Sequence, residues 1–167
     1  IDTSIAFIKL IDKLNLNVED AYKFLKNKST TEHRFEKVEI INGTRFINDS
    51  KSTNFHSVSS ASERVKNALL IMHGITKNIP TIELQLSNEI KKIIIPKDMN
   101  LDHNLFNCEV EVIKSIFELE DILKKDFQRF ETVLFSCGGS SFNDFENYIE
   151  RGKFFKSIVK NLKGGQN

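Results

Sequence analysis

The chain has 167 residues, enough for one hydrophobic core with a small appendage, and its 24 basic residues balance 23 acidic ones. This balance gives no net field that would favour a nucleic-acid partner. The two cysteines, Cys108 and Cys137, have no paired spacing and are expected to be reduced thiols, and no apolar run approaches the roughly 20 residues of a membrane span.

Two amphipathic helices are expected at the start of the chain. Apolar residues recur at helical spacing over residues 7–14 and again over residues 18–25. Residues 26–32 lose this periodicity and are rich in Lys, Ser and Thr, which predicts a domain boundary near Thr30. Because the sequence starts at Ile1 directly in a helical pattern, we expect residues 1–30 to be the end of a preceding domain and residues 31–167 to form their own.

The rest of the sequence predicts strands that alternate with helices. Asn42-Gly43 separates two strand-like runs, 35–41 and 44–48, and indicates a hairpin. Continuous apolar runs, typical of strands covered on both faces, occupy residues 68–72, 93–95 and 132–135. Helices are expected over 55–66, more weakly over 81–90, then over 116–127 and 155–162, with Gly164-Gly165 ending the last. This order predicts an α/β fold with a Rossmann-like, mostly parallel sheet, an edge hairpin and flanking helices.

Three polar loops follow predicted strands, at residues 49–54, 73–77 and 136–141. In an open parallel sheet, ligands bind beyond the carboxyl ends of the strands. Lys51 and Thr53 lie two residues apart and would project to the same side of an extended segment. Lys77 adds a second ammonium group, and the third loop, rich in Gly and Ser, leads into a helix whose first amides attract anions. The pattern suits a small molecule with one or two carboxylates.

Each of these signals also has a plainer interpretation. Gly138-Gly139 is commonly just a tight turn between a strand and a helix, and Lys77 alone would commonly be a solvated loop residue. His73 could be a satisfied turn residue, and Cys137 a small residue in a crowded turn with nothing nearby to make its thiolate reactive. The order and placement of the signals together carry the prediction.

Two stretches resemble a known family, the Mur ligases. The start of that family's C-terminal domain, in the form found in its D-glutamate-adding members, is similar to His33-Arg34-Phe35-Glu36, Ile41-Asn42-Gly43 and the run from Phe46 to Asn54. The closing motif of the same domain is similar to the run from Phe135 to Phe142 followed by Phe145, Asn147, Glu150, Arg151 and Gly152. The resemblance covers essentially the whole chain, and residues 1–30 are similar to the last helices of the ATP-binding central domain.

The resemblance implies a cytoplasmic step of peptidoglycan synthesis. In such a step ATP phosphorylates the carboxylate of UDP-N-acetylmuramoyl-L-alanine, and the amine of D-glutamate attacks the acyl phosphate. The C-terminal domain would bind D-glutamate and close over the nucleotide, while Mg²⁺ would be held by the central domain. A monomer without nucleic-acid or membrane partners is implied as well.

The family's binding residues can be carried over by position. The D-glutamate-binding residues would be Lys51, Thr53, Lys77, Ser141, Phe142 and Tyr148. The nucleotide-binding residues would be Arg34 at the phosphates, Asp49 at the ribose, and His33 nearby. No catalytic residue or metal ligand is expected within this chain. Because no Gly-x-x-x-x-Gly-Lys-Ser/Thr phosphate loop occurs in it, we expect the chain alone neither to hydrolyse ATP nor to form an amide bond.

The sequence departs from the family pattern at His73, where glycine is usual, at Ser136-Cys137-Gly138, where Ser-Pro-Ala is usual, and at Tyr148, where phenylalanine is usual. These differences indicate a divergent member. Two alternatives stay open: another amino-acid-adding ligase of the family, such as a folylpolyglutamate-type enzyme, or a non-catalytic binding module of the same fold. A dinucleotide-binding oxidoreductase is disfavoured because no Gly-x-Gly-x-x-Gly follows a predicted strand.

Overall fold

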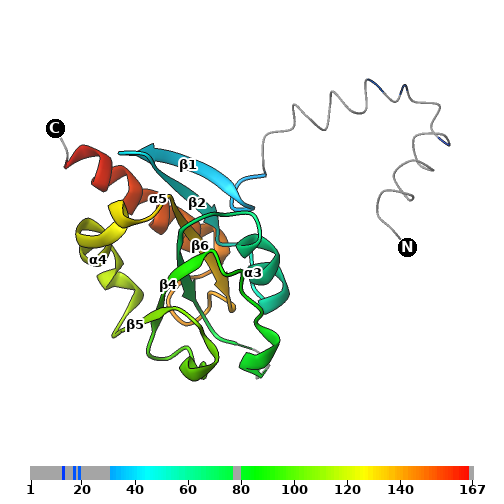
Figure 1. The fold of residues 1–167 in the computed structure, drawn as a ribbon. Helices are drawn as coiled ribbons and strands as arrows, with labels where there is room; N and C mark the ends of the chain where they lie inside the picture. The colour runs from blue at the N-terminus through cyan, green and yellow to red at the C-terminus, as the bar shows by residue number, and fades with distance from the viewer. Residues whose placement is uncertain (1–12, 14–16, 18, 20–30, 77–79, 166–167) are drawn as a thin grey trace. The chain divides into compact units, whose positions relative to one another are not determined.

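The computed structural model describes residues 13, 17, 19, 31–76 and 80–165, and Figure 1 draws the others as a thin grey trace. The chain divides into two compact units, Ile1–Thr31 and Glu32–Asn167, and every strand and helix named here belongs to the second. The two helices predicted before residue 30 fall where only residues 13, 17 and 19 are described. Lys77 also lies outside the described residues.

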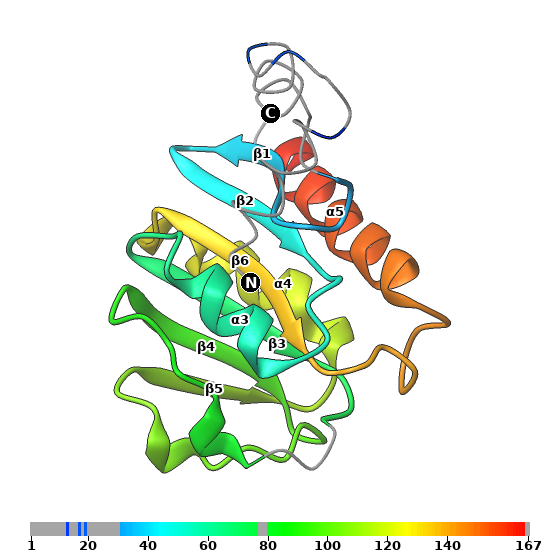
Figure 2. The same cartoon turned by 90° about the vertical axis from the view of Figure 1, so that its right-hand side faces the viewer.

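Six strands form one sheet in the order β1-β2-β6-β3-β4-β5, which Figure 2 shows from one edge to the other. β1 and β2 are antiparallel, and every other neighbouring pair is parallel. The predicted α/β fold, with a mostly parallel sheet and an edge hairpin, is therefore confirmed. The strands are β1 (Glu36–Ile41), β2 (Thr44–Asp49), β3 (Ala68–His73), β4 (Ile90–Pro96), β5 (Glu109–Ile113) and β6 (Thr132–Gly138).

The hairpin turn depends on two residues with left-handed backbone. Asn42 has a φ of 50° and Gly43 a φ of 87°, as a two-residue hairpin of the primed type requires. Asn tolerates this region better than most side chains, and Gly has no Cβ to clash. The Asn-Gly pair thus sets a register in which Ile41 lies opposite Thr44.

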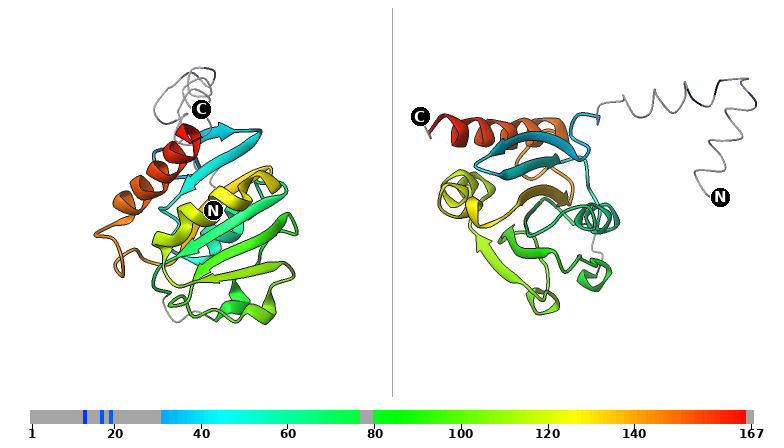
Figure 3. Two further views of the ribbon diagram at one scale, coloured as in Figure 1. Left: turned by 90° about the vertical axis from the view of Figure 1, so that its left-hand side faces the viewer. Right: turned by 45° about the horizontal axis from the view of Figure 1, so that its top comes forward.

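Helices cover both faces of the sheet. α3 (Phe55–Ser62) lies on one face, and α4 (Leu119–Asp126) and α5 (Tyr148–Gly164) lie on the other (Figures 1 and 3). Single turns of 3-10 helix occur at Thr81–Glu83, His103–Leu105, Ile116–Glu118 and Phe127–Arg129. In the described part of the chain, no helix combines the length and apolar character needed to cross a membrane.

Alternate residues of the central strands enter two separate apolar cores. In β3, Leu69 and Ile71 pack on the side of α4 and α5, whereas Leu70 and Met72 pack on the side of α3. All four side chains are fully buried. Since successive side chains of a strand point to opposite faces, a strand covered on both faces must be apolar at every position. This explains why the central strands have continuous apolar sequences.

The predicted helix over residues 81–90 is wrong. The structure has a single 3-10 turn at Thr81–Glu83, then a stretch without helix and a turn at residues 88–89 before β4, which begins at Ile90. The apolar residues here, Ile82, Leu84 and Leu86, recur every second position rather than at helical spacing. Of these three, only Leu84 is buried, so a helix would have no continuous apolar face to bury.

Several other elements differ in extent, most clearly α3 and α5, and one strand was not predicted. α3 ends at Ser62 instead of residue 66, and α5 begins at Tyr148 instead of residue 155. The early start of α5 is fixed by Asn147, whose Oδ1 accepts the N–H groups of Ile149 and Glu150 at 2.9 and 3.0 Å. The unpredicted strand, β5, is a short edge strand whose sequence alternates acidic and apolar residues.

Candidate functional site

The three predicted loops lie side by side at the carboxyl edge of the sheet. β6 lies between β2 and β3, so that Asp49 pairs with Ser136 and His73 pairs with Gly138. The Gly138 N–H donates to the Ser52 carbonyl oxygen at 2.9 Å, which ties the first loop to the third. The sequence therefore placed these loops correctly along one edge, where ligands of parallel sheets bind.

Backbone hydrogen bonds also join the second loop to the third. Ile75 and Ser140 donate to each other's carbonyl oxygens, both at 3.0 Å. This close approach requires glycine at position 74, because a Cβ on Gly74 would collide with the Ser140 carbonyl and the residue has a φ of 112°. These hydrogen bonds join the described parts of the three loops into one rim.

Arg151, in the first turn of α5, connects the three loops of the rim through hydrogen bonds. Its guanidinium group donates to the carbonyl oxygens of Ser50 at 2.8 Å, Gly139 at 3.0 Å and His73 at 3.1 Å. These three carbonyls belong to the three loops, and the Arg151 side chain is fully buried. A planar fork of five N–H donors is suited to bridging several acceptors at fixed angles. Arg151 is therefore the residue that joins all three loops.

His73 extends this buried network to the loop before α5. Its Nε2 lies 2.8 Å from Asp144 Oδ2, and its Nδ1 lies 3.3 Å from Arg151 Nη1. Burial lowers the pKa of His73, although the Asp144 carboxylate acts in the opposite direction. A neutral ring that donates from Nε2 to Asp144 and accepts at Nδ1 from Arg151 gives both ring nitrogens a partner, whereas the buried Nε of Arg151 has no hydrogen-bond partner among the described residues. His73 therefore serves to connect loops, inside the molecule.

The carboxylate of Asp49 is occupied mainly by groups of the protein. Its Oδ1 accepts the Phe35 N–H at 2.9 Å, and its Oδ2 accepts the hydroxyls of Ser52 at 2.5 Å and Ser136 at 2.8 Å. A carboxylate offers about four lone-pair sites, so these three donors leave one site on Oδ1. Asp49 therefore organises the loops and keeps one acceptor position for a further donor.

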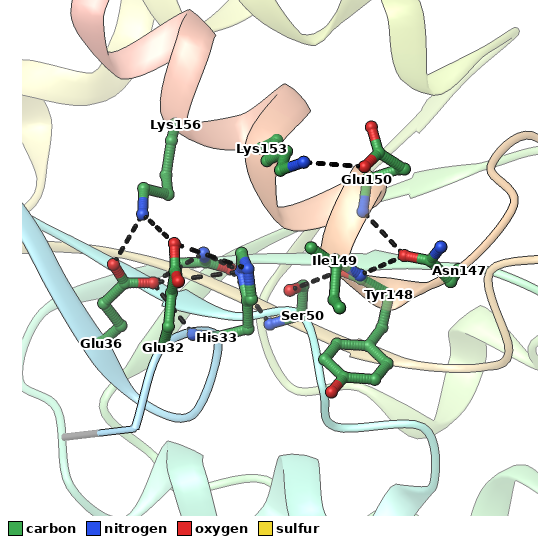
Figure 4. A network of polar contacts seen from close by, with 11 residues as sticks. Glu32, His33, Glu36, Ser50, Asn147, Tyr148, Ile149, Glu150, Lys153 and Lys156 are labelled. Carbon is green, nitrogen blue, oxygen red and sulfur yellow. Dashed lines mark hydrogen bonds and ion pairs between the residues drawn. The ribbon is translucent and has the colours of Figure 1, made fainter.

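The turn that carries Arg34 has a strained backbone. His33 and Phe35 have φ values of 66° and 45°, in the left-handed region that most side chains avoid. The His33 N–H donates to Glu36 Oε2 at 2.9 Å, and Asn48 Nδ2 lies 2.9 Å from His33 Nδ1. Figure 4 shows His33 beside the side chains of Glu32 and Glu36. Such a conformation persists because the surrounding hydrogen bonds over-determine it.

The side chain of His33 is buried, with an exposed fraction of only 3%. Its ring meets the Tyr148 ring edge-on at 6.1 Å between centroids, and burial lowers the pKa of His33 against the pull of Glu32 and Glu36. Lys156 of α5 donates to both of these carboxylates at 2.8 Å, as Figure 4 shows. The structure thus places His33 among supporting contacts and outside the set of residues that line the neighbouring pocket.

Lys51 and Tyr148 face each other at the rim. The Lys51 Nζ atom lies 4.8 Å from the centroid of the Tyr148 ring, and Thr53 is half-buried two residues further on. Ser141 is buried, and its carbonyl oxygen accepts the Phe145 N–H at 2.9 Å. Phe142, by contrast, is 73% exposed, so its ring contributes nothing to the core.

A basic pocket opens beside the rim, between the strained turn and α3. Its volume is about 260 Å³. Its cations, Arg34, Lys51 and Arg64, make no ion pair or side-chain hydrogen bond with any residue that the structure describes, and Asp49 is the one carboxylate among the lining residues. The excess of positive charge suits an anionic ligand. The lining residues are Arg34, Phe35, Asp49, Lys51, Ser52, Ser57, Ser60, Ala61 and Arg64.

The described residues contain no group of three His, Cys, Asp or Glu side chains that could hold a metal ion. Cys137 is completely buried in β6, and this burial raises its pKa to about 12. Such a thiol stays protonated near neutral pH and is unsuited to nucleophilic attack.

Sequence reasoning did not predict the roles of Arg151, Asp144 or Arg64. A signal for Arg151 appears only once α5 is known to begin at Tyr148, since a cation in the first turn of a helix opposes the helix dipole and implies another reason for its presence. Asp144 and Arg64 had no such signal, because their partners, His73 and Phe35, are distant in the sequence.

No family model matches the chain. Among curated proteins, the UDP-N-acetylmuramoylalanine--D-glutamate ligase of Thermosipho melanesiensis is 34% identical over 155 residues, which cover 90% of this chain and 36% of that protein. The ligase of the same name from Thermosipho africanus is 38% identical over 153 residues, covering 86% of this chain and 35% of that one. Among solved structures, the MurF ligase of Thermotoga maritima in complex with ADP has a TM-score of 0.59 at 13% identity, over 92% of this chain and 37% of that one, and so shares the fold. The chain spans little more than a third of the length of these relatives.

Proposed function

We propose that this chain, which belongs to the Mur ligase family, forms the amino-acid-binding C-terminal domain of an ATP-dependent ligase that adds D-glutamate to UDP-N-acetylmuramoyl-L-alanine. The observation that carries the proposal is the match, across 86% and 90% of the chain, to two ligases named for D-glutamate. The complete reaction, its cytoplasmic location, its place in peptidoglycan synthesis and a monomeric state all belong to the proposal.

The reaction has two steps. The terminal phosphoryl group of ATP is transferred to the substrate carboxylate, which gives an acyl phosphate and ADP. The amine of D-glutamate then attacks the acyl carbon, an amide bond forms, and inorganic phosphate leaves with the bonding electrons. The domain contributes mainly by orientation, because holding the amine beside the acyl carbon makes the second step effectively unimolecular.

The proposal assigns the carboxylates of D-glutamate to the rim of the sheet edge. Lys51 supplies a cation whose position is fixed by the Tyr148 ring, and Thr53 supplies a hydroxyl on the same side of the chain. Ser141, the last residue of the third loop, offers a second hydroxyl group. The set proposed for D-glutamate is completed by Lys77, Phe142 and Tyr148, of which Lys77 lies outside the described residues.

The proposal assigns the nucleotide to the basic pocket. Arg34 would contact the phosphates, where a cation offsets the charge that develops during phosphoryl transfer. Asp49 would accept a ribose hydroxyl at its remaining lone-pair site. His33 would not contact the nucleotide directly. Its hydrogen bond with Asn48 stabilises the turn that carries Arg34. Mg²⁺ is assigned to residues of the ligase that lie outside this chain.

Competition between amine substrates tests the proposal. The complete ligase is supplied with ATP and UDP-N-acetylmuramoyl-L-alanine, and formation of the amide product is measured with D-glutamate, L-glutamate and a diamino acid in turn. We expect D-glutamate to have the highest kcat/KM. Preference for L-glutamate or for the diamino acid would instead indicate a sister ligase, and loss of all ligation in a folded, complete protein would indicate a binding module.

A further inference from the structure

We propose that Arg64 is a further phosphate-binding residue of the basic pocket and that Phe35 is the residue that positions it. The guanidinium carbon of Arg64 lies 3.6 Å from the centroid of the Phe35 ring. The inference rests on the proposed function for the identity of the ligand, the polyphosphate chain of a nucleotide, but it concerns two residues to which that function assigns no role.

Stacking on a ring leaves the hydrogen-bonding capacity of a guanidinium group intact. A guanidinium carbon only 3.6 Å from the ring centroid fits stacking through the flat face of the group, and in that arrangement the N–H donors lie in the plane and point outward from its edge. No described carboxylate pairs with Arg64, which lies two residues beyond the end of α3, with its backbone N–H donating to the Ala61 carbonyl oxygen at 3.1 Å. The donors of Arg64 are therefore oriented in advance and available to an anion.

The Phe35 ring is a fixed support because its backbone is fixed. Phe35 has a φ of 45°, an uncommon value for a bulky residue, and its N–H is held by Asp49 Oδ1 at 2.9 Å. The ring is half-buried and packs in part against the core under α3. Strain of this kind is commonly found where a ligand site needs a fixed geometry. Here it places Arg64 and Arg34 on the same pocket.

The remaining lining residues complete an environment for phosphate. Arg34 brings a second cation, and Lys51, which the proposed function assigns to D-glutamate, adds positive charge at the edge of the same pocket. Ser57 and Ser60 of α3 also line the pocket. A triphosphate carries several negative charges along a short chain, which matches several cations distributed around one pocket better than a single cation would. A nucleoside without phosphates would gain nothing from Arg64.

Binding of inorganic tripolyphosphate to the 167-residue chain tests the inference. Calorimetry at fixed, low ionic strength compares the unaltered chain with Arg64→Gln, Phe35→Leu and a matched control, Arg129→Gln. Arg129 is also exposed but pairs with Asp126 at 2.8 Å and does not line the pocket. We expect Kd to rise about tenfold for Arg64→Gln and severalfold for Phe35→Leu, and to change less than about twofold for Arg129→Gln. Amide NMR shifts on titration should move at Ser57 and Ser60.

Several results would overturn the inference. If Arg64→Gln and Arg129→Gln weakened binding equally, the effect would be one of net charge and would not belong to the pocket. If the unaltered chain did not bind tripolyphosphate at millimolar concentration, the proposed phosphate site would not exist. Weakening by Arg34→Gln without weakening by Arg64→Gln would refute the role of Arg64 and leave the proposed function standing. The proposed function itself fails on a separate result, the preference for another amine in the ligation assay.

Discussion

The Lys51 Nζ atom lies 4.8 Å from the centroid of the Tyr148 ring, and this contact joins the first strand-end loop to the start of α5. The same two segments are joined by the Ser50 hydroxyl, which donates to the Tyr148 carbonyl oxygen at 3.0 Å. The ring face thus holds the ammonium group where it can meet a carboxylate. Replacing the ring should therefore weaken D-glutamate binding without removing the cation.

We expect Tyr148→Leu to raise the KM for D-glutamate about three- to fivefold in the complete ligase, and Tyr148→Phe to leave it nearly unchanged. The first substitution removes a cation–π contact of about 0.5–1 kcal/mol, whereas the second keeps the aromatic face. Steady-state kinetics at saturating ATP measures both. If Tyr148→Phe raised KM as much as Tyr148→Leu, the hydroxyl would be the important group.

Arg151→Met should destabilise the chain strongly, by about 3 kcal/mol or more in the free energy of unfolding. The substitution leaves the carbonyl oxygens of Ser50, His73 and Gly139 without their buried donor, and each unsatisfied group costs about 1–3 kcal/mol. Urea unfolding provides the measurement, with Arg129→Met as an exposed control. A loss below about 1 kcal/mol would show that the three loops do not depend on Arg151.

Gly152→Ala should also be destabilising, by about 1–3 kcal/mol, because an added Cβ would collide with the His33 ring and the Ser50 hydroxyl. The conflict is between α5 and the strained turn. His33→Ala removes the ring with which the new Cβ collides. The double variant should therefore lose less unfolding free energy than the sum of the losses in the two single variants. If the two losses were strictly additive, the destabilisation by Gly152→Ala would not come from a collision with the His33 ring.

The stability of the chain should fall as the pH decreases from 6.5 to 5. Burial holds the pKa of His73 below its usual value, so the unfolded chain, with a histidine pKa of about 6.5, binds more protons than the folded chain in this window. His33 acts in the same direction, also through burial. Each histidine contributes a slope of at most about 1.4 kcal/mol per pH unit.

His73→Gln isolates one of these contributions. The amide keeps a donor for Asp144 but does not titrate, so the slope of unfolding free energy against pH should decrease between pH 6.5 and 5. The contribution of His33 should persist in this variant and disappear in His33→Gln. An unchanged slope in both variants would mean that neither histidine is kept neutral by the fold. Urea unfolding at a series of pH values supplies the data.

The parts of the fold that local sequence determines were predictable. Asn42-Gly43 encoded the hairpin, and continuous apolar runs encoded β3, β4 and β6, because covered strands need apolar residues at every position. β5 was not predictable, since its glutamates are accommodated by a tertiary contact. The buried Lys92 ammonium bonds to Glu109 at 2.9 Å and Glu111 at 2.7 Å.

Some features of the candidate site were likewise predictable from the sequence, and others were not. The positions of Lys51 and Thr53 beside a strand end followed from the order of the elements, because the carboxyl ends of parallel strands share one edge. The joining role of Arg151 did not follow, since its bond to the Ser50 carbonyl spans 101 residues of sequence. The stacking of Arg64 on Phe35 likewise depends on a strained turn that no local pattern announces.

The measurement that tests the central claim most directly is the effect of Thr53→Val on the two substrates of the complete ligase. The substitution keeps the shape of the side chain and removes the hydroxyl proposed to hold a D-glutamate carboxylate. The matched control is Ser57→Ala, which removes a hydroxyl from the basic pocket instead. We predict that Thr53→Val raises the KM for D-glutamate about tenfold and changes the KM for ATP less than about twofold. An equal rise in both constants would contradict the assignment of this sheet edge to D-glutamate.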